Sequence, residues 1–286
     1  MNQRCPICDR TNSRRFFQKY GYWILTCEVC SHQFTEFTPS AAHVARVYND
    51  RYFQGGGAGY PNYLSEAQIL RSHSQRYSKI LANYMQPGTV LDVGAAAGFV
   101  LQGFLDSGWS GRGIEPNSHM AEYARIRLGL TVDTGTLEQI QSRERYDLIS
   151  MIQVVAHFFE LNKALQAAAA ATNPNGFWLI ETWNRESCAA RTFGTNWHEY
   201  SPPSVLHWFS PTGLQRLAAR YGFREVASGR PAKWINGAHA KSLLRYKLES
   251  SRLGKIAVRM LDVIPERLSI PYPAEDLFWA LFQKSY

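Results

Sequence analysis

The stretch LDVGAAAGF at residues 91–99 decides the fold of this chain of 286 residues. The apolar run TVLDVG predicts a short strand, which a turn of glycine and alanine follows, and a helix is predicted from Gly98 to Asp106. Small residues let the backbone approach a ligand closely, and the first turn of a helix has free N–H groups. This unit therefore predicts a site for a nucleoside-containing ligand where the strand meets the helix.

Strands and helices alternate on the C-terminal side of this stretch. The predicted strands are RGIEP, TVDTG, YDLISMIQVV and GFWLIET, and the predicted helices cover 118–128, 161–171 and 211–220. Such alternation implies an α/β fold with a mostly parallel sheet and helices on both faces. We expect the segments REVASG, at 224–229, and WINGAHA, at 234–240, to close the sheet as an antiparallel pair.

A carboxylate supports the ligand site. Glu115 ends the strand that follows the glycine-rich turn, about 20 residues on, where a carboxylate can accept hydrogen bonds from both ribose hydroxyls. These features do not by themselves distinguish a nicotinamide dinucleotide from other nucleoside cofactors.

The order of the motifs distinguishes them. LDVGAAAGF, GIEPN, YDLISMIQVVAHF and PNGFWLIET resemble, in order and spacing, the motifs of class I S-adenosylmethionine-dependent methyltransferases over residues 88–228. The turn does not fit the G-x-G-x-x-G pattern of dinucleotide oxidoreductases. The resemblance implies a Rossmann-like fold, S-adenosylmethionine as cofactor and methyl transfer as the activity.

The resemblance also implies roles for individual residues. It places the glycine-rich turn beside the amino-acid part of the cofactor, an acidic residue below the turn, a ribose-binding carboxylate, two residues beside the adenine and one facing the transfer cleft. In this sequence these are Gly94, Ala96, Gly98, Asp92, Glu115, Thr136, Leu137 and Gln153. Apart from the resemblance, Tyr60 and Tyr63 precede the cofactor helix, and we expect them either to cover the cofactor or to pack. Ala96 departs from the glycine that is common in the family, and we expect it to need a negative φ.

Four of the five cysteines form two close pairs, Cys5/Cys8 and Cys27/Cys30. Two such pairs can place four thiolates tetrahedrally around Zn²⁺, and a site with four protein ligands is structural. His32 is an alternative ligand. The arrangement resembles the N-terminal zinc ribbon of some sugar-modifying and natural-product methyltransferases. It differs from a ribosomal-RNA methyltransferase group that uses three cysteines and a histidine.

Histidines are the candidates for the general base that a hydroxyl or carbon acceptor needs. His157 follows the fourth strand, where related small-molecule enzymes often carry Glu-His, but Ala156 replaces the Glu, which disfavours a metal-assisted reaction. His198 and His207 lie in the long aromatic segment 183–209, which we interpret as a substrate lid. The alternative for each histidine, and for the aromatic residues of the segment, is plain packing.

Composition limits the organisation and the partners of the chain. We expect a zinc ribbon at 1–38, a helical lead-in at 39–86 that covers the cofactor, a methyltransferase domain at 87–240 and a basic, helical C-terminal extension at 241–286. The last segment carries 8 Lys and Arg against 5 Asp and Glu, and its tail PYPAEDLFWALF packs on the body or contacts a membrane surface or second copy.

The sequence also predicts the acceptor class and the location. No apolar stretch approaches the roughly 18 residues of a membrane span, and no secretory signal precedes the cysteines, so we expect a cytoplasmic protein. The predicted acceptor is a small molecule or a sugar or glycan, methylated on oxygen or carbon, and DNA is not expected. The alternatives are an RNA methyltransferase, disfavoured because residues 1–38 lack a dense basic cluster, and a non-catalytic module that binds the cofactor.

Overall fold

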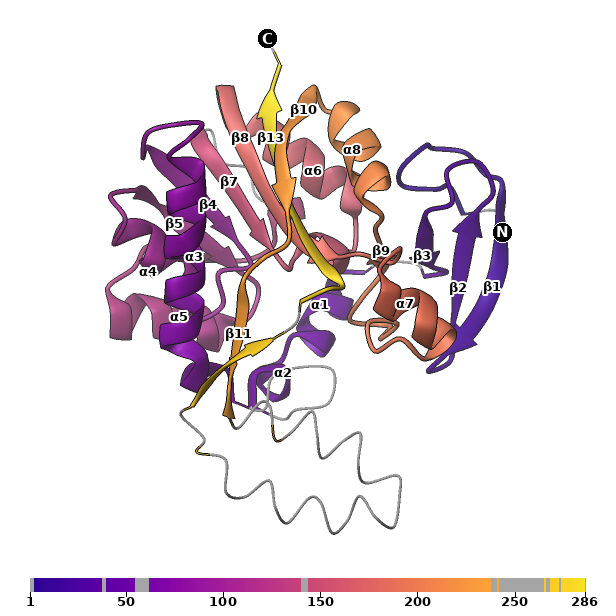
Figure 1. Ribbon diagram of the computed structural model, residues 1–286, viewed down its shortest axis with the longest axis horizontal. Helices are drawn as coiled ribbons and strands as arrows, with labels where there is room; N and C mark the ends of the chain where they lie inside the picture. The colour runs from indigo at the N-terminus through magenta and orange to yellow at the C-terminus, as the bar shows by residue number, and fades with distance from the viewer. Residues whose placement is uncertain are drawn as a thin grey trace.

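A seven-stranded sheet forms the centre of the protein, as a computed structural model shows (Figure 1). The structure describes residues 3–37, 40–54, 62–139, 144–237, 241, 265, 268–272 and 274–285. The strand order is β10-β13-β8-β7-β4-β5-β6. The parallel strands β4 to β8 are Thr89–Val93, Ser110–Glu115, Val132–Thr134, Tyr146–Ile152 and Thr172–Trp183. All five lie where the sequence predicts strands.

Helices cover both faces of this sheet, as predicted. On one side lie α3, α4 and α5, which are Ala67–Leu81, Phe99–Leu105 and Ser118–Leu128. On the other lie α6 and α8, which are Leu161–Ala170 and Pro211–Ala219. Because successive side chains of a strand point to opposite faces, Val90 and Leu91 enter two separate hydrophobic cores.

The C-terminal segment differs from the expectation. Residues Leu277–Lys284 form β13, which pairs antiparallel with both β8 and β10, Phe223–Gly229. The predicted pairing of REVASG with WINGAHA is therefore wrong, and this part of the extension is strand rather than helix. The run LFWALF is buried throughout, as in an interior strand that is covered on both faces. The helix expected within residues 242–264 lies outside the described residues.

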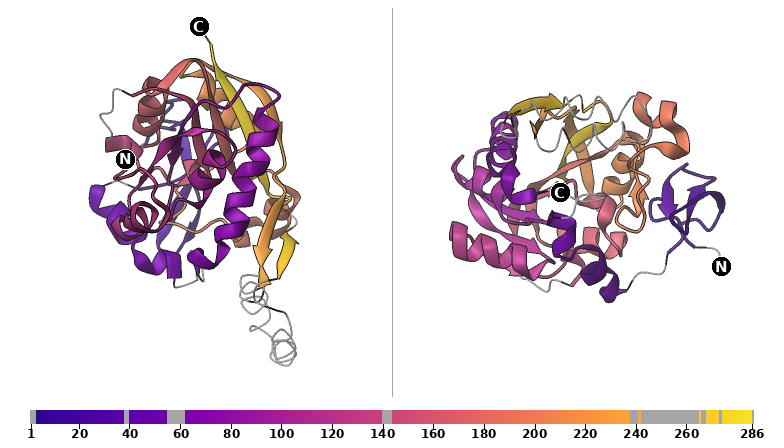
Figure 2. Two further views of the ribbon diagram at one scale, coloured as in Figure 1. Left: turned by 90° about the vertical axis from the view of Figure 1, so that its left-hand side faces the viewer. Right: turned by 90° about the horizontal axis from the view of Figure 1, so that it is seen from below.

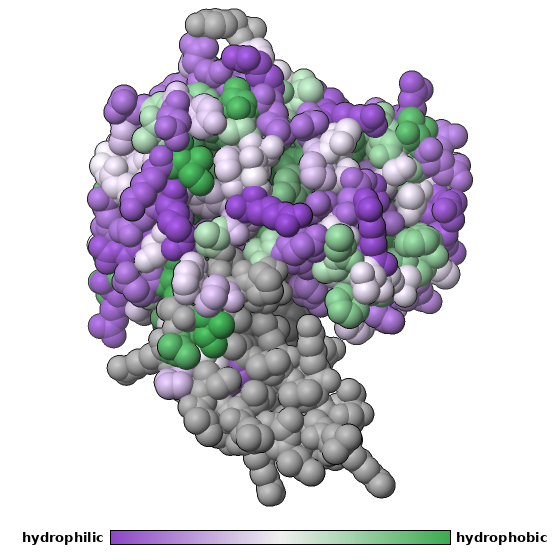
Figure 3. All heavy atoms as spheres, viewed as in Figure 1, coloured by the Kyte–Doolittle hydropathy of each residue, from purple (hydrophilic) through white to green (hydrophobic). Residues whose placement is uncertain are grey.

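The C-terminal extension contains a second strand outside the central sheet, β12, Ser269–Tyr272. It pairs antiparallel with β11, Lys233–Asn236. Among the described residues, no helix is long and apolar enough to cross a membrane. On the face seen in Figure 3, apolar side chains are interspersed with polar ones.

The N-terminal module is a small antiparallel sheet that lies beside the main body (Figures 1 and 2). Its strands β1, β2 and β3 are Ser13–Lys19, Tyr22–Cys27 and Gln33–Thr35. A fourth strand, β9, comes from His207–Trp208 and pairs with β3. The segment 183–209, which also contains α7, Cys188–Phe193, therefore joins the module to the body. Its Trp197, Tyr200 and Trp208 are buried, as the packing alternative for these aromatics requires.

Short helices lie where the parallel strands end. These are α1, Ala41–Val47, α2, Asp50–Gln54, and the 3₁₀ turn Tyr63–Glu66. Their side chains line one cavity together with residues from the ends of β4, β5 and β7. Tyr60, the second predicted covering tyrosine, lies outside the described residues.

Candidate active site

The glycine-rich turn takes up three left-handed backbone conformations. Gly94, Ala96 and Gly98 have φ values of 69°, 47° and 86°. The expectation of a negative φ at Ala96 is thus wrong: a methyl group is tolerated in the left-handed region, at a cost of roughly 1–2 kcal/mol. An added Cβ on Gly94 would lie 2.3 Å from Val154 Cγ1, so this position has no room for a side chain.

Glu115 holds the turn in place. Its Oε2 accepts a hydrogen bond from the Ala96 N–H at 2.8 Å, and its Oε1 accepts one from the Asn117 N–H at 2.8 Å. The side chain is buried, and burial raises the pKa of this carboxyl to about 7. Each carboxylate oxygen has a second lone pair for a ligand hydroxyl. The carboxylate at the end of β5 therefore fits the ribose of a nucleoside.

Asp92 lies below the same turn, on β4. It is buried, and burial raises its pKa to about 7. Among the described residues, its Oδ2 has no hydrogen-bond partner. An unpartnered buried carboxylate oxygen is costly, and an ammonium group with an intervening water would satisfy it. This orphaned atom fits the amino-acid end of S-adenosylmethionine.

The cavity brings most of the predicted cofactor residues together. Its wall includes Tyr63, Gly94, Ala96, Glu115, Thr136, Leu137 and Gln153. Asp92 and Gly98 are not part of this wall, so Asp92 would reach the ammonium group of the cofactor only through a water molecule. Tyr63 stacks on Phe99 with ring centroids 5.8 Å apart, so it closes the cavity from the lead-in side.

His157 is the predicted catalytic histidine that reaches the cavity. Its Nδ1 lies 2.7 Å from the Ser204 carbonyl oxygen, which also accepts a hydrogen bond from the Tyr48 hydroxyl. A carbonyl only accepts, so Nδ1 carries the proton and Nε2 keeps a lone pair. Burial lowers the pKa of His157, which keeps the ring neutral at pH 7.

The other two predicted catalytic histidines lie outside the described cavity wall. The side chain of His198 is 49% exposed, with Nε2 lying 3.2 Å from Glu199 Oε1. His207 is buried where the module meets the body, and its Nε2 donates to the Phe158 carbonyl. Burial lowers the pKa of His207 to about 4. Neither the exposed nor the packed ring reaches the cavity, because segment 183–209 turns toward the module.

A buried carboxylate that the sequence analysis did not single out lies beside the cavity. Glu181, on β8, is fully buried and accepts hydrogen bonds from His73, Tyr77 and Gln153. His73 and Gln153 line the cavity. The signal in the sequence is Glu181 itself, the one charged residue in the apolar strand GFWLIETW.

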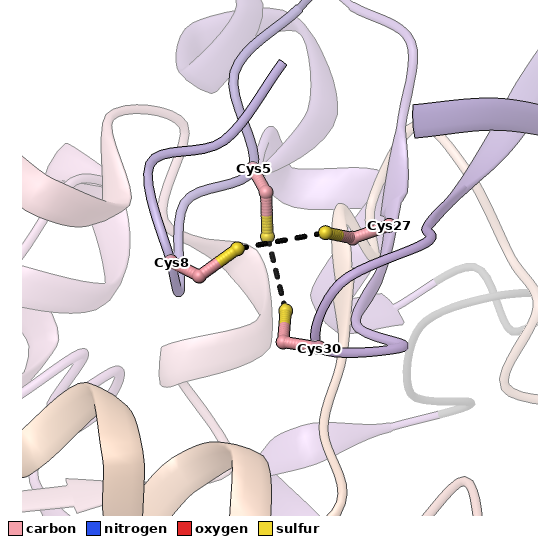
Figure 4. Close-up of side chains that lie close together, drawn as sticks. All are labelled: Cys5, Cys8, Cys27 and Cys30. Atoms are coloured by element: carbon pink, nitrogen blue, oxygen red, sulfur yellow. Dashed lines mark hydrogen bonds between the residues drawn. The ribbon is translucent and has the colours of Figure 1, made fainter. Parts of the chain in front are cut away.

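The four cysteines of the module converge (Figure 4). Their sulfur atoms all lie within 4.8 Å of one another, with Cys5–Cys30 at 3.4 Å and Cys8–Cys27 at 3.5 Å. Tetrahedral Zn–S bonds of about 2.3 Å place sulfurs about 3.8 Å apart, so the thiols fit this ion. His32 is not part of the cluster, since its ring stacks on Phe34 at 5.9 Å.

Comparison with known proteins agrees with this geometry. Residues 65–228 match the family model described as a methyltransferase domain. The ubiquinone biosynthesis O-methyltransferase of Rhodopseudomonas palustris is 31% identical over 101 residues, covering 34% of this chain and 40% of that protein. The enzyme of the same name from Azorhizobium caulinodans is 30% identical over 135 residues, covering 44% and 50%. The chain thus matches half or less of the length of these relatives.

Solved structures share the fold. A methyltransferase of Thermotoga maritima has a TM-score of 0.54 at 17% identity, covering 86% of this chain and all of its own. The magnesium protoporphyrin IX methyltransferase of Synechocystis, solved with bound S-adenosylhomocysteine, has a TM-score of 0.55 at 13% identity, with 86% and 100% covered. Because the methyltransferase family model covers more than half of the chain, the chain belongs to the class I S-adenosylmethionine-dependent methyltransferase family.

Proposed function

We propose that this protein transfers the methyl group of S-adenosylmethionine to a hydroxyl oxygen of a small molecule, with His157 as the general base. The observation that carries the proposal is the hydrogen bond from His157 Nδ1 to the Ser204 carbonyl, which leaves a basic Nε2 at the cavity that the cofactor residues line. The names of the curated relatives, which are O-methyltransferases of ubiquinone biosynthesis, support a small-molecule acceptor.

We infer the roles of the residues from the family resemblance together with their positions at the cavity. Bound S-adenosylmethionine supplies an electrophilic methyl group on a sulfonium sulfur. Glu115 would hold the ribose hydroxyls, Thr136 and Leu137 would border the adenine, and Asp92 would balance the ammonium group. His157 would remove the proton from the acceptor hydroxyl as the hydroxyl oxygen takes up the methyl group from the sulfonium sulfur. The products are a methyl ether and S-adenosylhomocysteine, with the proton on His157.

We further propose that Zn²⁺ bound by the four cysteines has a structural role. The ribbon is too small for a core of its own, and the metal supplies the missing stability. Because four thiolates complete the coordination of Zn²⁺, this site leaves no position for a substrate.

RNA is the alternative class of methyl acceptor. Binding to a phosphate backbone needs lysine and arginine near the transfer site. The described cavity wall contains neither residue, whereas it contains Glu66, Glu115 and Glu138. The charges at the site therefore favour the small-molecule proposal.

The test uses labelled S-adenosylmethionine and a small-molecule extract. We expect wild-type protein to label a low-mass fraction and His157→Ala to lose about 10²–10⁴-fold of that rate, the usual contribution of a general base. Both proteins should bind S-adenosylhomocysteine equally well. His198→Ala, outside the cavity, serves as the comparison variant and should stay active. Full activity of His157→Ala would refute its role, and labelling of RNA alone would refute the acceptor class.

A further inference from the structure

Glu181 organises a set of polar side chains beside the cavity. His73 Nε2 lies 2.7 Å from Glu181 Oε2, which also accepts from the Tyr77 hydroxyl. Gln153 Nε2 donates to Glu181 Oε1 at 2.7 Å, and the Gln153 backbone N–H donates to the Glu181 carbonyl at 2.8 Å. A carboxylate accepts only, so it dictates that each partner turns a donor toward it.

The orientation of Gln153 is a consequence of this network. Its NH₂ group faces Glu181, so the amide oxygen Oε1 points away from that carboxylate. Gln153 lines the cavity, and Oε1 has no hydrogen-bond partner among the described residues. The residue has a φ of 57°, which is uncommon for a side chain of this size and is typical of functional positions. Glu181 thus makes Gln153 present an acceptor to the ligand.

The rest of the cavity agrees with a ligand that donates hydrogen bonds. His157 Nε2 is a second acceptor there, because Nδ1 carries the ring proton and donates it to the Ser204 carbonyl. The described wall contains carboxylates but no lysine or arginine. Its aromatic residues, which lie among aliphatic ones, include Tyr48, Tyr52, Phe53, Tyr63, Phe158 and Trp234. An anionic group would lose its hydration without gaining a cationic partner.

The geometry points to an uncharged aromatic acceptor that carries a hydroxyl besides the one that is methylated. This further hydroxyl donates to Gln153 Oε1, whose orientation Glu181 fixes, while the methylated hydroxyl gives its proton to His157. This inference rests on the proposed function, since it assigns the acceptor class of the same site. Gln153 is a specificity-determining residue in this arrangement, and Glu181 is a positioning residue that acts through it.

Glu181→Gln provides a discriminating perturbation. The new amide oxygen satisfies the donors of His73 and Tyr77, and the new NH₂ group then faces Gln153. Two NH₂ groups cannot bond to each other, so the Gln153 amide rotates and presents its own NH₂ to the cavity. Relative to wild type, the variant should therefore bind hydroxyl ligands less tightly and carboxylates more tightly.

The experiment measures binding to full-length protein saturated with S-adenosylhomocysteine, by calorimetry at pH 7. The probes are two matched pairs, 2-naphthol with 2-naphthoate and 4-methylphenol with 4-methylbenzoate. For wild type we expect at least tenfold tighter binding of the hydroxyl member in one or both pairs. Glu181→Gln should reduce that ratio at least tenfold. Tyr77→Phe, which removes one donor to Glu181 without touching the cavity, should leave the ratio unchanged.

The outcomes separate this inference from the proposed function. General damage to the fold weakens both members of a pair equally, whereas reorientation of Gln153 changes their ratio. Equal or reversed preference in wild type, binding of no probe, or an unchanged ratio in Glu181→Gln would each overturn the inference. Failure of wild type to bind S-adenosylhomocysteine would instead overturn the proposed function.

Discussion

Replacing Glu115 by Gln tests the cofactor site at the carboxylate on which it depends. In the wild type the two oxygens accept the N–H groups of Ala96 and Asn117, both at 2.8 Å. A Gln side chain has one oxygen, so its NH₂ group must face one of these buried N–H groups. The second oxygen is then missing as an acceptor for a ribose hydroxyl, and loss of a hydrogen bond to a charged group removes about 1.5–3 kcal/mol of binding free energy. Since about 1.4 kcal/mol corresponds to a factor of ten, the dissociation constant of S-adenosylhomocysteine should rise about 10- to 100-fold.

Calorimetry at pH 8 measures this change, because the carboxyl, with its pKa raised to about 7, is then ionised. Glu122→Gln, an exposed change on α5, is the matched control and should bind like wild type. Only the ionised carboxylate accepts both ribose hydroxyls, so wild-type affinity should fall as the pH decreases below 7. Glu115→Gln should keep only the part of that pH dependence that comes from Asp92, whose pKa is also raised to about 7. Binding of Glu115→Gln within twofold of wild type, with both proteins folded, would refute the assigned role.

Three further predictions concern the turn, the base and the metal. Gly94→Ala should bind S-adenosylhomocysteine at least about tenfold more weakly, because its Cβ would lie 2.3 Å from Val154 Cγ1. Adding Val154→Ala to this variant should restore part of the affinity. Wild-type affinity of Gly94→Ala in calorimetry would contradict the prediction. With His157 as base, kcat/KM should rise with pH through a pKa below the ordinary histidine value of 6.5 and then stay level, because burial lowers the pKa of His157. A kcat/KM that falls over this pH range would contradict the role of His157. Metal analysis should find about one Zn per chain, and Cys27→Ser should lose the metal and unfold at a lower temperature than wild type. Wild-type protein that unfolds at the same temperature with and without metal would contradict a structural zinc.

Local sequence predicted the elements that bind the cofactor. The strand, turn and helix around residues 91–99 and the carboxylate at Glu115 follow from residue type and spacing, because a strand and the next turn are neighbours in the chain. Ala96 is the exception. Its φ of 47° is stabilised by a hydrogen bond to Glu115, 19 residues away, which outweighs the local preference of alanine.

The acceptor side of the site was less predictable. Of the three histidines in the sequence hypothesis, His157 alone is found in the described cavity wall. His198 and His207 belong to a segment whose aromatic composition resembles a substrate lid but which joins the N-terminal module to the body. Composition does not distinguish the two, because both a lid and an internal interface are rich in tryptophan, tyrosine and histidine.

The sequence by itself determined the α/β class, the cofactor motif and the cysteine cluster, since each depends on residues that are close in the chain. Only the tertiary structure decided that β13 inserts between β8 and β10, that β9 completes the sheet of the module, and that Glu181 meets His73 across 108 residues of chain. Such contacts depend on which long-range pairings bury the most apolar surface while satisfying every buried polar group. The most favourable set of pairings depends on the whole chain, so a local sequence pattern does not predict it.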